Sequence, residues 1–415
     1  MCGICGFTGY RQDQKTVIER MMKAIEHRGP DSEGSFCREK ITLGFRRLSI
    51  IDLEDGQQPM ESADGNLHIV FNGEIYDYKE LREELEASGI SFRTHSDTEV
   101  LVNTIQQYGE KALDKLRGMF GFAVWNEKEQ TLMLARDFFG IKPVYYAEID
   151  GHFVFASEIK SILAFPGYER KVNQKALEQY LSFQYAPLEE TFFKGIYKLM
   201  PGHMLLYKNG NYEIKTYFKT KLTPGKWNRK TNIDQLRSQL AEILKDSVKH
   251  HMLSDVEVGA FLSGGVDSGY LASASGADQA FTVGFDEGDR YSEVNKAAKV
   301  AEKAGLKHHV KIISKQEFWD ALPDVMYHMD EPLGDASAVA LYFLSKEAAG
   351  HVKVVLSGEG ADELFGGYNI YREPEALKKV AWIPFVLRRA VRKLAAKLPD
   401  VKGRDFLIRA GMKVE

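Results

Sequence analysis

The segment VGAFLSGGVDSGYLASA, residues 258–274, contains the pattern that decides the fold of the second half of the chain. Its apolar residues Val258–Leu262 predict a buried strand, and the residues from Ser268 onward predict a helix. Two glycines between them let backbone N–H groups turn toward an anion, and the helix N-terminus adds its dipole. The segment therefore predicts a phosphate-binding loop at the end of a strand.

Strands and helices alternate around this loop. Apolar runs predict three more strands and helical spacing predicts three more helices: strands at Ala280–Phe285, His309–Ile313 and Val352–Leu356, and helices at Asp234–Met252, Tyr291–Gly305 and Ser337–Gly350. This alternation is typical of an α/β domain with an open, mostly parallel sheet.

The first 200 residues have a different pattern. Short apolar runs broken by Gly, Asp and Asn predict strands, and two segments have helical spacing: strands at Ile41–Ile51, His68–Glu74, Met119–Trp125, Thr131–Ala135 and His152–Ala156, and helices at Lys79–Ser88 and Thr98–Tyr108. These strands follow one another too closely for βαβ units, which predicts an α+β domain. Because Pro201–Asn232 is rich in Gly, Pro and charge, we expect domains at 1–205 and 234–415 and a linker at 206–233.

Composition excludes several classes of protein. Charged residues make up 27% of the 415-residue chain and the net charge is −4, so we expect no nucleic-acid partner. There is no apolar stretch long enough to cross a bilayer and no signal-peptide pattern, so we expect no membrane partner. The three cysteines, Cys2, Cys5 and Cys37, are too few for a disulfide framework, which favours a reducing, cytoplasmic location.

Cys2 directly follows the initiator Met1. Removal of Met1, which a small second residue permits, would give Cys2 a free α-amine beside its thiol. One residue could then supply both the nucleophile and the general base. A cysteine at position 2 is by itself more often a small buried apolar residue, so the assignment depends on the surrounding motifs.

Five short motifs occur in order: CGICG (2–6), HRGPD (27–31), RLSII (47–51), NGEIY (72–76) and SDTE (96–99). Together they resemble the N-terminal-nucleophile glutamine amidotransferases, which release ammonia from glutamine. The resemblance implies an αββα sandwich and a catalytic Cys2. It also implies a glutamine pocket made of Arg47, Leu48, Ser49, Ile50, Ile51, Asn72, Gly73, Glu74 and Asp97.

The chemistry of glutamine agrees with these residue types. Arg47 can donate two hydrogen bonds to the α-carboxylate, and Asp97 can pair with the α-ammonium. By resemblance, the Asn72 side chain and the Gly73 N–H stabilise the oxyanion that forms when Cys2 attacks. One position departs from several members of the class, which have a histidine where this chain has Phe45.

The loop SGGVDS (263–268) differs from the GxxxxGK[ST] loop of kinases and GTPases. It resembles the loop of the ATP-pyrophosphatases, which form adenylates. The resemblance implies ATP binding by Phe261, Leu262, Ser263, Gly264, Gly265, Asp267, Ser268, Val283, Ser357 and Gly358. It further implies Mg²⁺ bound by Asp267 and Asp362, and a catalytic role for Glu359 in forming the β-aspartyl adenylate.

The two halves together resemble the glutamine-hydrolysing asparagine synthetases. The expected function is ATP-dependent asparagine synthesis from aspartate and glutamine, with a homodimer as an open possibility. Two alternatives remain: another amide- or lactam-forming adenylating ligase, and a degenerate relative that only binds glutamine or nucleotide. Members of this family continue past the point that matches Glu415. We therefore expect a synthetase domain that is incomplete at its C-terminus, either as a fragment or as a natural truncation.

Overall fold

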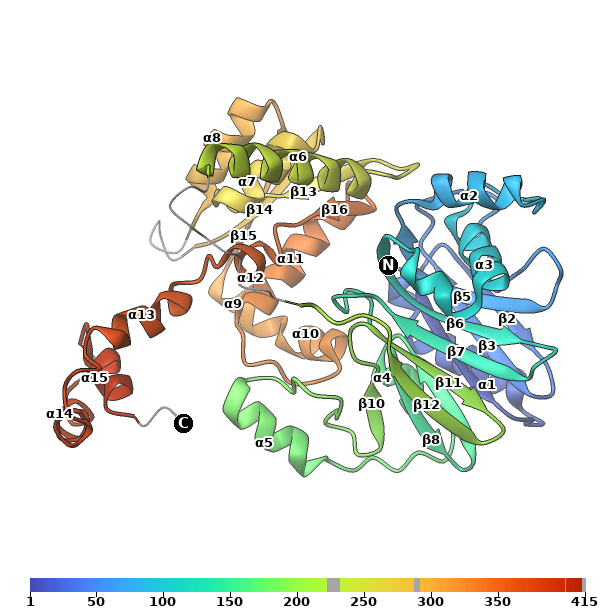
Figure 1. The fold of residues 1–415 in the computed structure, drawn as a ribbon, viewed down its shortest axis with the longest axis horizontal. Helices are drawn as coiled ribbons and strands as arrows, with labels where there is room; N and C mark the ends of the chain where they lie inside the picture. The colour runs from blue at the N-terminus through green and yellow to red at the C-terminus, as the bar shows by residue number, and fades with distance from the viewer. Residues whose placement is uncertain (222–231, 287–291, 400, 413–415) are drawn as a thin grey trace. The chain divides into compact units, whose positions relative to one another are not determined.

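The computed structural model describes residues 1–221, 232–286, 292–399 and 401–412. The chain divides into two compact units, Met1–Leu356 and Ser357–Glu415, which are described separately (Figure 1). Residues 222–231 of the expected linker lie outside the described residues, as does Tyr291, the first residue of a predicted helix.

Two antiparallel sheets form the first half of the larger unit. The first sheet has the order β10-β8-β9-β1-β3-β2, with strands β1 (Gly3–Thr8), β2 (Ser32–Cys37), β3 (Ile41–Arg47), β8 (Tyr145–Ile149), β9 (His152–Ala156) and β10 (Ile196–Lys198). The second has the order β12-β11-β7-β6-β5-β4, with strands β4 (Met60–Glu61), β5 (Leu67–Ile75), β6 (Gly118–Asn126), β7 (Thr131–Arg136), β11 (His203–Lys208) and β12 (Asn211–Thr216).

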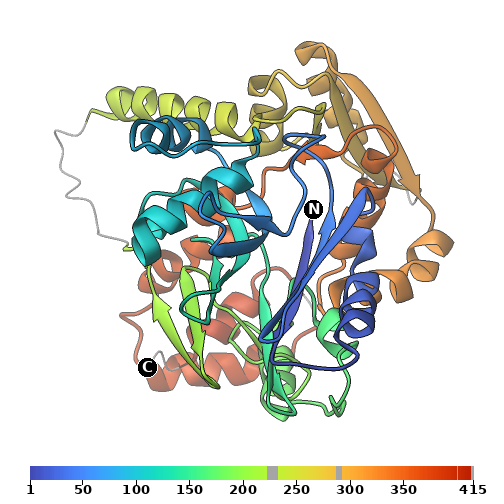
Figure 2. The same ribbon diagram turned by 90° about the vertical axis from the view of Figure 1, so that its right-hand side faces the viewer.

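The two sheets pack face to face, because apolar side chains from both fill one cluster that includes Ile4, Phe45, Val70 and Trp125. Helices α1 (Gln14–Ala24) and α4 (Ile159–Leu163) cover the outer face of the first sheet. Helices α2 (Tyr78–Ala87) and α3 (Asp97–Tyr108) cover the second (Figure 2). This is the expected αββα sandwich.

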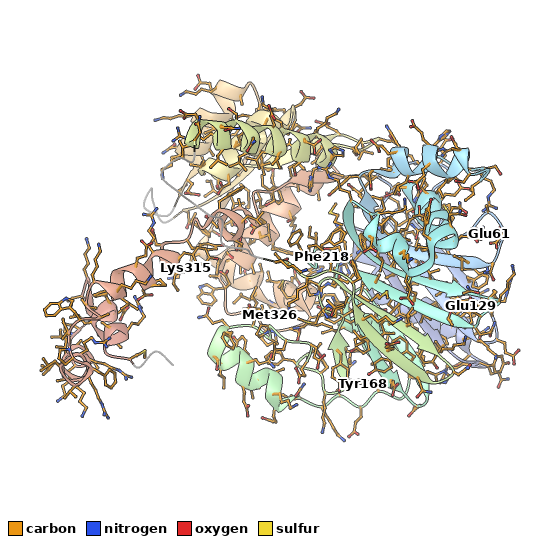
Figure 3. The ribbon with its side chains drawn as sticks, viewed as in Figure 1. Glu61, Glu129, Tyr168, Phe218, Lys315 and Met326 are labelled. Atoms are coloured by element: carbon orange, nitrogen blue, oxygen red, sulfur yellow. The ribbon has the colours of Figure 1, made fainter. Side chains whose placement is uncertain are left out.

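The segment after residue 200 differs from the expectation. Strands β11 and β12 form a hairpin that extends the second sheet, so residues 206–216 of the expected linker lie in this sheet. Asn209 and Gly210 have φ values of 52° and 81°, which is the Asn-Gly turn that favours a two-residue hairpin. Polar residues lie at the margins of the same sheet: Glu61 in β4 and Glu129 between β6 and β7 are exposed (Figure 3).

The third sheet is parallel and has the order β15-β14-β13-β16. Its strands are β13 (Val258–Phe261), β14 (Gln279–Phe285), β15 (Lys307–Ile313) and β16 (Val354–Leu356), and its helices are α6 (Ile233–His251), α7 (Val266–Ala274), α8 (Val294–Ala304), α9 (Lys315–Asp320), α10 (Leu322–Met329) and α11 (Ser337–Ala349). Small alanines of α7 and α8 pack on β13 and β14, whereas α11 packs with Ile313 of β15. The expected α/β domain is thereby confirmed.

Remaining elements of the first unit are short: α5 (Gln174–Phe183), η1 (Glu26–Arg28) and η2 (Gly109–Asp114). The second unit contains α12 (Ala361–Phe365), η3 (Asn369–Arg372), α13 (Glu373–Lys378), α14 (Phe385–Ala395) and α15 (Arg404–Ala410). Arg388 of α14 donates to the carbonyl of Ala410 at 3.0 Å, and this hydrogen bond joins α14 to α15. Across the described residues, no helix combines the length and apolar character needed to cross a membrane.

Candidate functional site

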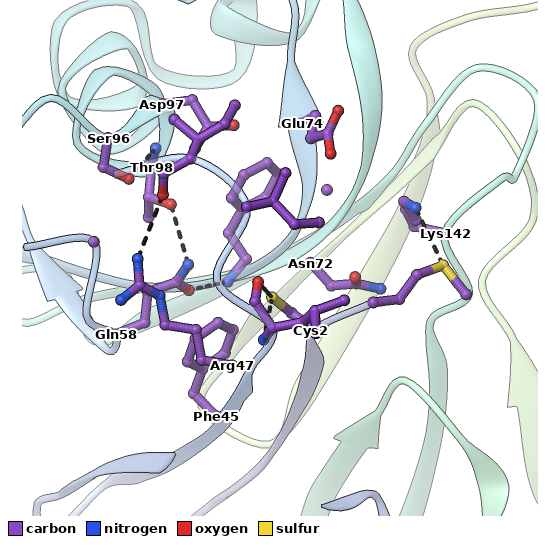
Figure 4. Close-up of a pocket in the computed structure, with 17 residues that line it drawn as sticks. Cys2, Phe45, Arg47, Gln58, Asn72, Glu74, Ser96, Asp97, Thr98 and Lys142 are labelled. Carbon is purple, nitrogen blue, oxygen red and sulfur yellow. Dashed lines mark hydrogen bonds between the residues drawn. The ribbon is translucent and has the colours of Figure 1, made fainter. Parts of the chain in front are cut away.

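A cavity of about 60 Å³ lies beside the first strand of the chain (Figure 4). Every residue expected in the glutamine pocket lines it except Ser49, whose backbone N–H instead donates to Asp31 at 2.9 Å. The lining consists of Met1, Cys2, Phe45, Arg47, Leu48, Ile50, Ile51, Gly56, Gln58, Phe71, Asn72, Gly73, Glu74, Ser96, Asp97, Thr98 and Lys142. The structure therefore gathers four of the five N-terminal motifs at one cavity.

Cys2 directly precedes β1, and several contacts fix its position. Its Sγ is 3.4 Å from the backbone N–H of Leu48, which donates to it. Its carbonyl accepts a hydrogen bond from Arg28 Nε at 2.9 Å. Burial raises the pKa of the Cys2 thiol and lowers the pKa of the neighbouring Met1 α-amine to about 5. A thiol in this place is protonated at neutral pH and needs a base to react.

Asn72 and Gly73 lie in β5, directly behind Cys2. With its amide oriented to satisfy both neighbours, Asn72 donates to the Cys2 carbonyl at 3.1 Å and accepts from Arg28 Nη2 at 3.3 Å. A Cβ on Gly73 would lie 2.2 Å from the carbonyl oxygen of Met119 on the neighbouring strand. Only glycine is therefore accommodated at this position of the cavity wall.

Arg47 is a buried cation that forms no ion pair within the described part of the chain. Its guanidinium donates to the backbone carbonyls of Leu53 at 3.1 Å and Ile51 at 3.4 Å, and to that of Asp52. These contacts hold the planar group in one orientation at the cavity. A buried guanidinium without a carboxylate partner is ready to receive one from a ligand.

Asp97 is the matching buried carboxyl at the N-terminus of α3. Burial raises its pKa to about 6, although it accepts a hydrogen bond from the Ile75 N–H at 3.1 Å. None of the ion pairs found among the described residues involves Asp97. Glu74 lies nearby, and burial raises its pKa to about 7, with Lys142 acting in the opposite direction. The cavity thus places an unpaired cation and an unpaired carboxyl on its walls.

Lys142 is a cavity residue that the sequence did not reveal. Its Nζ lies 3.2 Å from Met1 Sδ, and burial lowers its pKa while Glu74 raises it. The carboxylate of Asp137 holds the preceding loop by accepting from the N–H groups of Ile141 at 2.9 Å and Lys142 at 2.8 Å. The only signal in the sequence is a lysine after Gly140-Ile141, and a lone lysine is usually a solvated surface residue.

The SGGVDS loop follows β13 as expected and is largely exposed. Gly264 has a φ of 77°, and a Cβ there would lie 2.9 Å from the backbone nitrogen of Ala297 in α8. The hydroxyls of Ser263 and Ser268 lie 2.9 Å apart and close the loop. Helix α7 begins at Val266, so Asp267 lies in its first turn. The loop therefore presents its backbone and one carboxylate to solvent.

The other residues expected at the nucleotide occupy two units. In the first unit, Phe261-Leu262 and Val283 lie at the carboxyl ends of the adjacent parallel strands β13 and β14. In the second unit, Ser357, Gly358 and Glu359 follow β16 in the chain, and Asp362 lies in the first turn of α12. The pairing of Asp267 with Asp362 stays a prediction, because the two belong to different units.

These features define two classes of protein. An αββα sandwich with a cysteine at the start of a central strand is an N-terminal-nucleophile hydrolase fold. A parallel sheet with a glycine-rich loop between strand and helix is a nucleotide-binding α/β fold.

Comparison with known proteins agrees with both classes. The family model of the glutamine amidotransferase domain matches residues 1–218, and that of asparagine synthase matches residues 239–409. Asparagine synthetase [glutamine-hydrolyzing] 1 of Bacillus subtilis is 45% identical over 98% of this chain and 66% of its own length. A putative asparagine synthetase [glutamine-hydrolyzing] of Mycobacterium tuberculosis is 38% identical over 100% of this chain and 68% of its own. Amidase chyE of Penicillium rubens is 32% identical over 92% of this chain and 60% of its own.

The chain belongs to the family of glutamine-hydrolysing asparagine synthetases. It spans about two thirds of the length of the curated relatives it matches, 66% for the Bacillus subtilis protein. The resemblance inferred from the five N-terminal motifs and the SGGVDS loop is thereby confirmed.

Proposed function

We propose that the chain carries out glutamine-dependent asparagine synthesis, with ammonia released at Cys2 and consumed in the second half of the chain. The observation that supports this most strongly is the pair of buried, unpaired charges, Arg47 and Asp97, in the cavity of Cys2. Glutamine carries an α-carboxylate and an α-ammonium that complement these charges. We further propose that the chain has two domains and that β11 and β12 belong to the first.

Cys2 is the proposed nucleophile. Met1 lines the cavity, so its removal enlarges the space beside Cys2 and leaves the α-amine on the nucleophilic residue itself. The amine takes the thiol proton as sulfur attacks the glutamine amide carbon, and then gives a proton to the departing ammonia. Water, deprotonated by the same amine, hydrolyses the resulting thioester to glutamate.

Asn72 and Gly73 are the proposed oxyanion donors, since the Asn72 amide and the Gly73 backbone lie in the wall behind Cys2. Preorganised donors of this kind stabilise the tetrahedral intermediate without reorganising during the reaction. Leu48, Ser49, Ile50, Ile51 and Glu74 would complete the glutamine pocket.

The second half is proposed to bind ATP at the SGGVDS loop. The exposed backbone of the loop, the dipole of α7 and the hydroxyls of Ser263 and Ser268 are suited to phosphate. We assign adenine contacts to Phe261, Leu262 and Val283, further nucleotide contacts to Gly264, Gly265, Ser357 and Gly358, and formation of the acyl-adenylate to Glu359.

Mg²⁺ is the proposed cofactor of this half. Asp267 fits such an ion because its carboxylate is exposed in the first turn of α7, where a bare phosphate would be repelled. Asp362, half-buried in the first turn of α12, would be the second carboxylate. When bound, Mg²⁺ supplies positive charge that neutralises the phosphates of ATP.

A second candidate function is amide formation on a carboxylate other than aspartate. The relative named Amidase chyE supports this alternative, because it shares both halves of the chain under a different name. A degenerate relative without turnover is the third candidate.

One assay separates the three candidates: the purified chain with ATP, Mg²⁺, glutamine and a panel of carboxylates. Equal amounts of AMP and asparagine that depend on aspartate would support the proposal. AMP that depends only on another carboxylate would replace it by the second candidate. Absence of glutamate and AMP in every mixture would leave the third.

A further inference from the structure

Two histidines and a glutamate meet at the edge of the parallel sheet, outside both sites described above. His309 lies in β15, Glu347 in the last turn of α11, and His351 two residues beyond the end of this helix. Their potential ligand atoms all lie within 4.8 Å of one another. We propose that His309, Glu347 and His351 bind a divalent transition-metal ion, with Zn²⁺ as the probe that fits best.

The residue types match this class of metal. Two imidazoles and one carboxylate form a ligand set that Zn²⁺ takes up, with a water in the fourth position. Hard ions such as Mg²⁺ prefer oxygen ligands, so the cluster differs in selectivity from the proposed site at Asp267. Within the residues that the structure describes, it is the one group of three His, Cys, Asp or Glu side chains with this geometry.

Neighbouring residues already orient the first ligand. Gln279 Oε1 lies 2.8 Å from His309 Nε2, and an amide oxygen can only accept, so Nε2 carries the proton. Nδ1 then keeps its lone pair for a metal. Phe281 stacks on the same ring with centroids 5.0 Å apart. A hydrogen bond to the second ring nitrogen is the usual support of a metal-binding histidine.

The other two ligands are free to complete the site. His351 Nε2 and Glu347 Oε1 are 3.7 Å apart, and their side chains are 36% and 33% exposed. Ligand atoms around a tetrahedral ion at about 2.0–2.1 Å lie about 3.3 Å from one another, so modest side-chain rotation closes the cluster.

The consequence of binding is a link between two elements. A metal ion would bind β15 directly to the carboxyl end of α11, in addition to the apolar packing of Ile313 against Val339 and Phe343. An ion that binds the folded chain and not the unfolded chain raises the melting temperature. The structure therefore assigns this cluster a stabilising role that is independent of glutamine and ATP.

The test is a Zn²⁺ titration of the full chain in excess Mg²⁺, read out by competition with a chromophoric chelator and by thermal denaturation. All variants carry Cys2→Ser, because a free thiol near the N-terminus could bind Zn²⁺ itself. We expect one site per chain, a rise in Tm with Zn²⁺, and a loss of at least about tenfold in affinity in His351→Ala and in Glu347→Gln. Bound Co²⁺ should give an intense d–d absorption that both variants lose.

Two matched variants control for nonspecific effects. His95→Ala removes an exposed histidine of the first half, and Glu302→Gln removes an exposed carboxylate of α8. Both should bind Zn²⁺ like the parent. Equal Zn²⁺ affinity in the parent, His351→Ala and Glu347→Gln would overturn the proposal, as would a parent chain without a Zn²⁺-dependent change in Tm.

Discussion

At the scale of the residue, Cys2 is the group whose removal should separate the two proposed activities. We expect Cys2→Ala to abolish glutamine hydrolysis while ammonia-dependent synthesis persists, because the nucleophile lies in the αββα sandwich and not in the parallel-sheet half. Glutamate release from glutamine, and AMP release with ammonium chloride, are the two measurements. Cys37→Ala, a half-buried cysteine of β2 outside the cavity, is the control. Equal loss of both activities in Cys2→Ala would contradict the assignment.

Lys142 is the second residue with a specific expected effect. Beside the larger effect of burial, its positive charge acts to lower the pKa of the Cys2 thiol and of the Met1 α-amine, and we expect it to act in the same way on the Cys2 α-amine once Met1 is removed. Without it, the amine keeps its proton to a higher pH and the thiol is harder to ionise. We therefore expect Lys142→Met to move the acidic limb of the glutaminase pH profile to higher pH, with a fall in kcat/KM of about tenfold for a shift of about one unit.

The measurement for Lys142→Met is the pH dependence of kcat/KM. Lys194→Met, at an exposed lysine far from the cavity in sequence and absent from its lining, should leave the profile unchanged. A Lys142→Met enzyme with the parental profile would show that this charge does not act on the nucleophile.

The cavity was largely predictable because its residues occur in contiguous motifs. Arg47, Asn72 and Asp97 are each surrounded by several residues of a motif, and the structure brings them together. Gln58 and Lys142 were not predictable, because neither lies in such a motif. The side chain of Gln58 is held at the cavity by two hydrogen bonds: it accepts from the Phe71 N–H at 2.6 Å and donates to Thr98 Oγ1 at 3.1 Å. Only the fold creates these contacts.

At the scale of the element, the strands of the parallel sheet were predicted to within about two residues. A parallel strand is covered on both faces, so it appears in the sequence as a continuous apolar run. The hairpin of β11 and β12 was missed because β12 is mostly exposed and carries polar residues. Helix α5 was missed as well, because Ala176 alone among its residues is buried and its apolar face is weakly marked. Helix α1 was missed although its buried residues Val17, Ile18, Met21 and Met22 have helical spacing.

The phosphate loop depends on the conformation of one glycine. In Gly264→Ala, the alanine would have to adopt the positive φ of 77° that the glycine has. Its Cβ would lie 2.9 Å from the Ala297 backbone nitrogen and 2.7 Å from Lys296 Cβ. We expect it to reduce AMP formation by more than about tenfold and to leave glutamine hydrolysis intact. The strained φ alone costs about 1–2 kcal/mol of stability.

Gly276→Ala is the matched control for the loop. Gly276 has nearly the same φ, 72°, but a Cβ there meets nothing within 4 Å. The control therefore carries the backbone strain without the steric clash. Comparable AMP formation in the two variants would show that close packing of the loop against α8 is not required.

At the scale of the larger unit, residues that follow α10 hold the parallel-sheet half against the sandwich. Asp330 and Glu331 lie in the segment that connects α10 to α11. Asp330 forms an ion pair with Lys160 at 2.9 Å, and Glu331 forms one with Lys198 at 3.2 Å. Asp330 also accepts from the backbone N–H of Ile159 at 2.7 Å. Both carboxylates therefore contact the first half of the chain.

Asp330→Asn should weaken the packing of the parallel-sheet half against the sandwich more than the loss of an exposed ion pair would. Both side chains of the Asp330–Lys160 pair are only 9% exposed, and removing one partner of a buried pair costs about 3 kcal/mol because it leaves the other charge uncompensated. Glu158, which also pairs with Lys160, limits the loss. We expect a lower Tm by calorimetry and faster amide exchange at Ile159 and Lys160.

The control is Asp246→Asn, because the ion pair of Asp246 with Arg117 also joins the two halves. The side chains of Asp246 and Arg117 are 51% and 47% exposed, so the loss of this pair should change Tm little. If Asp330→Asn lowered Tm no more than Asp246→Asn, burial of the pair would not be what holds the halves together.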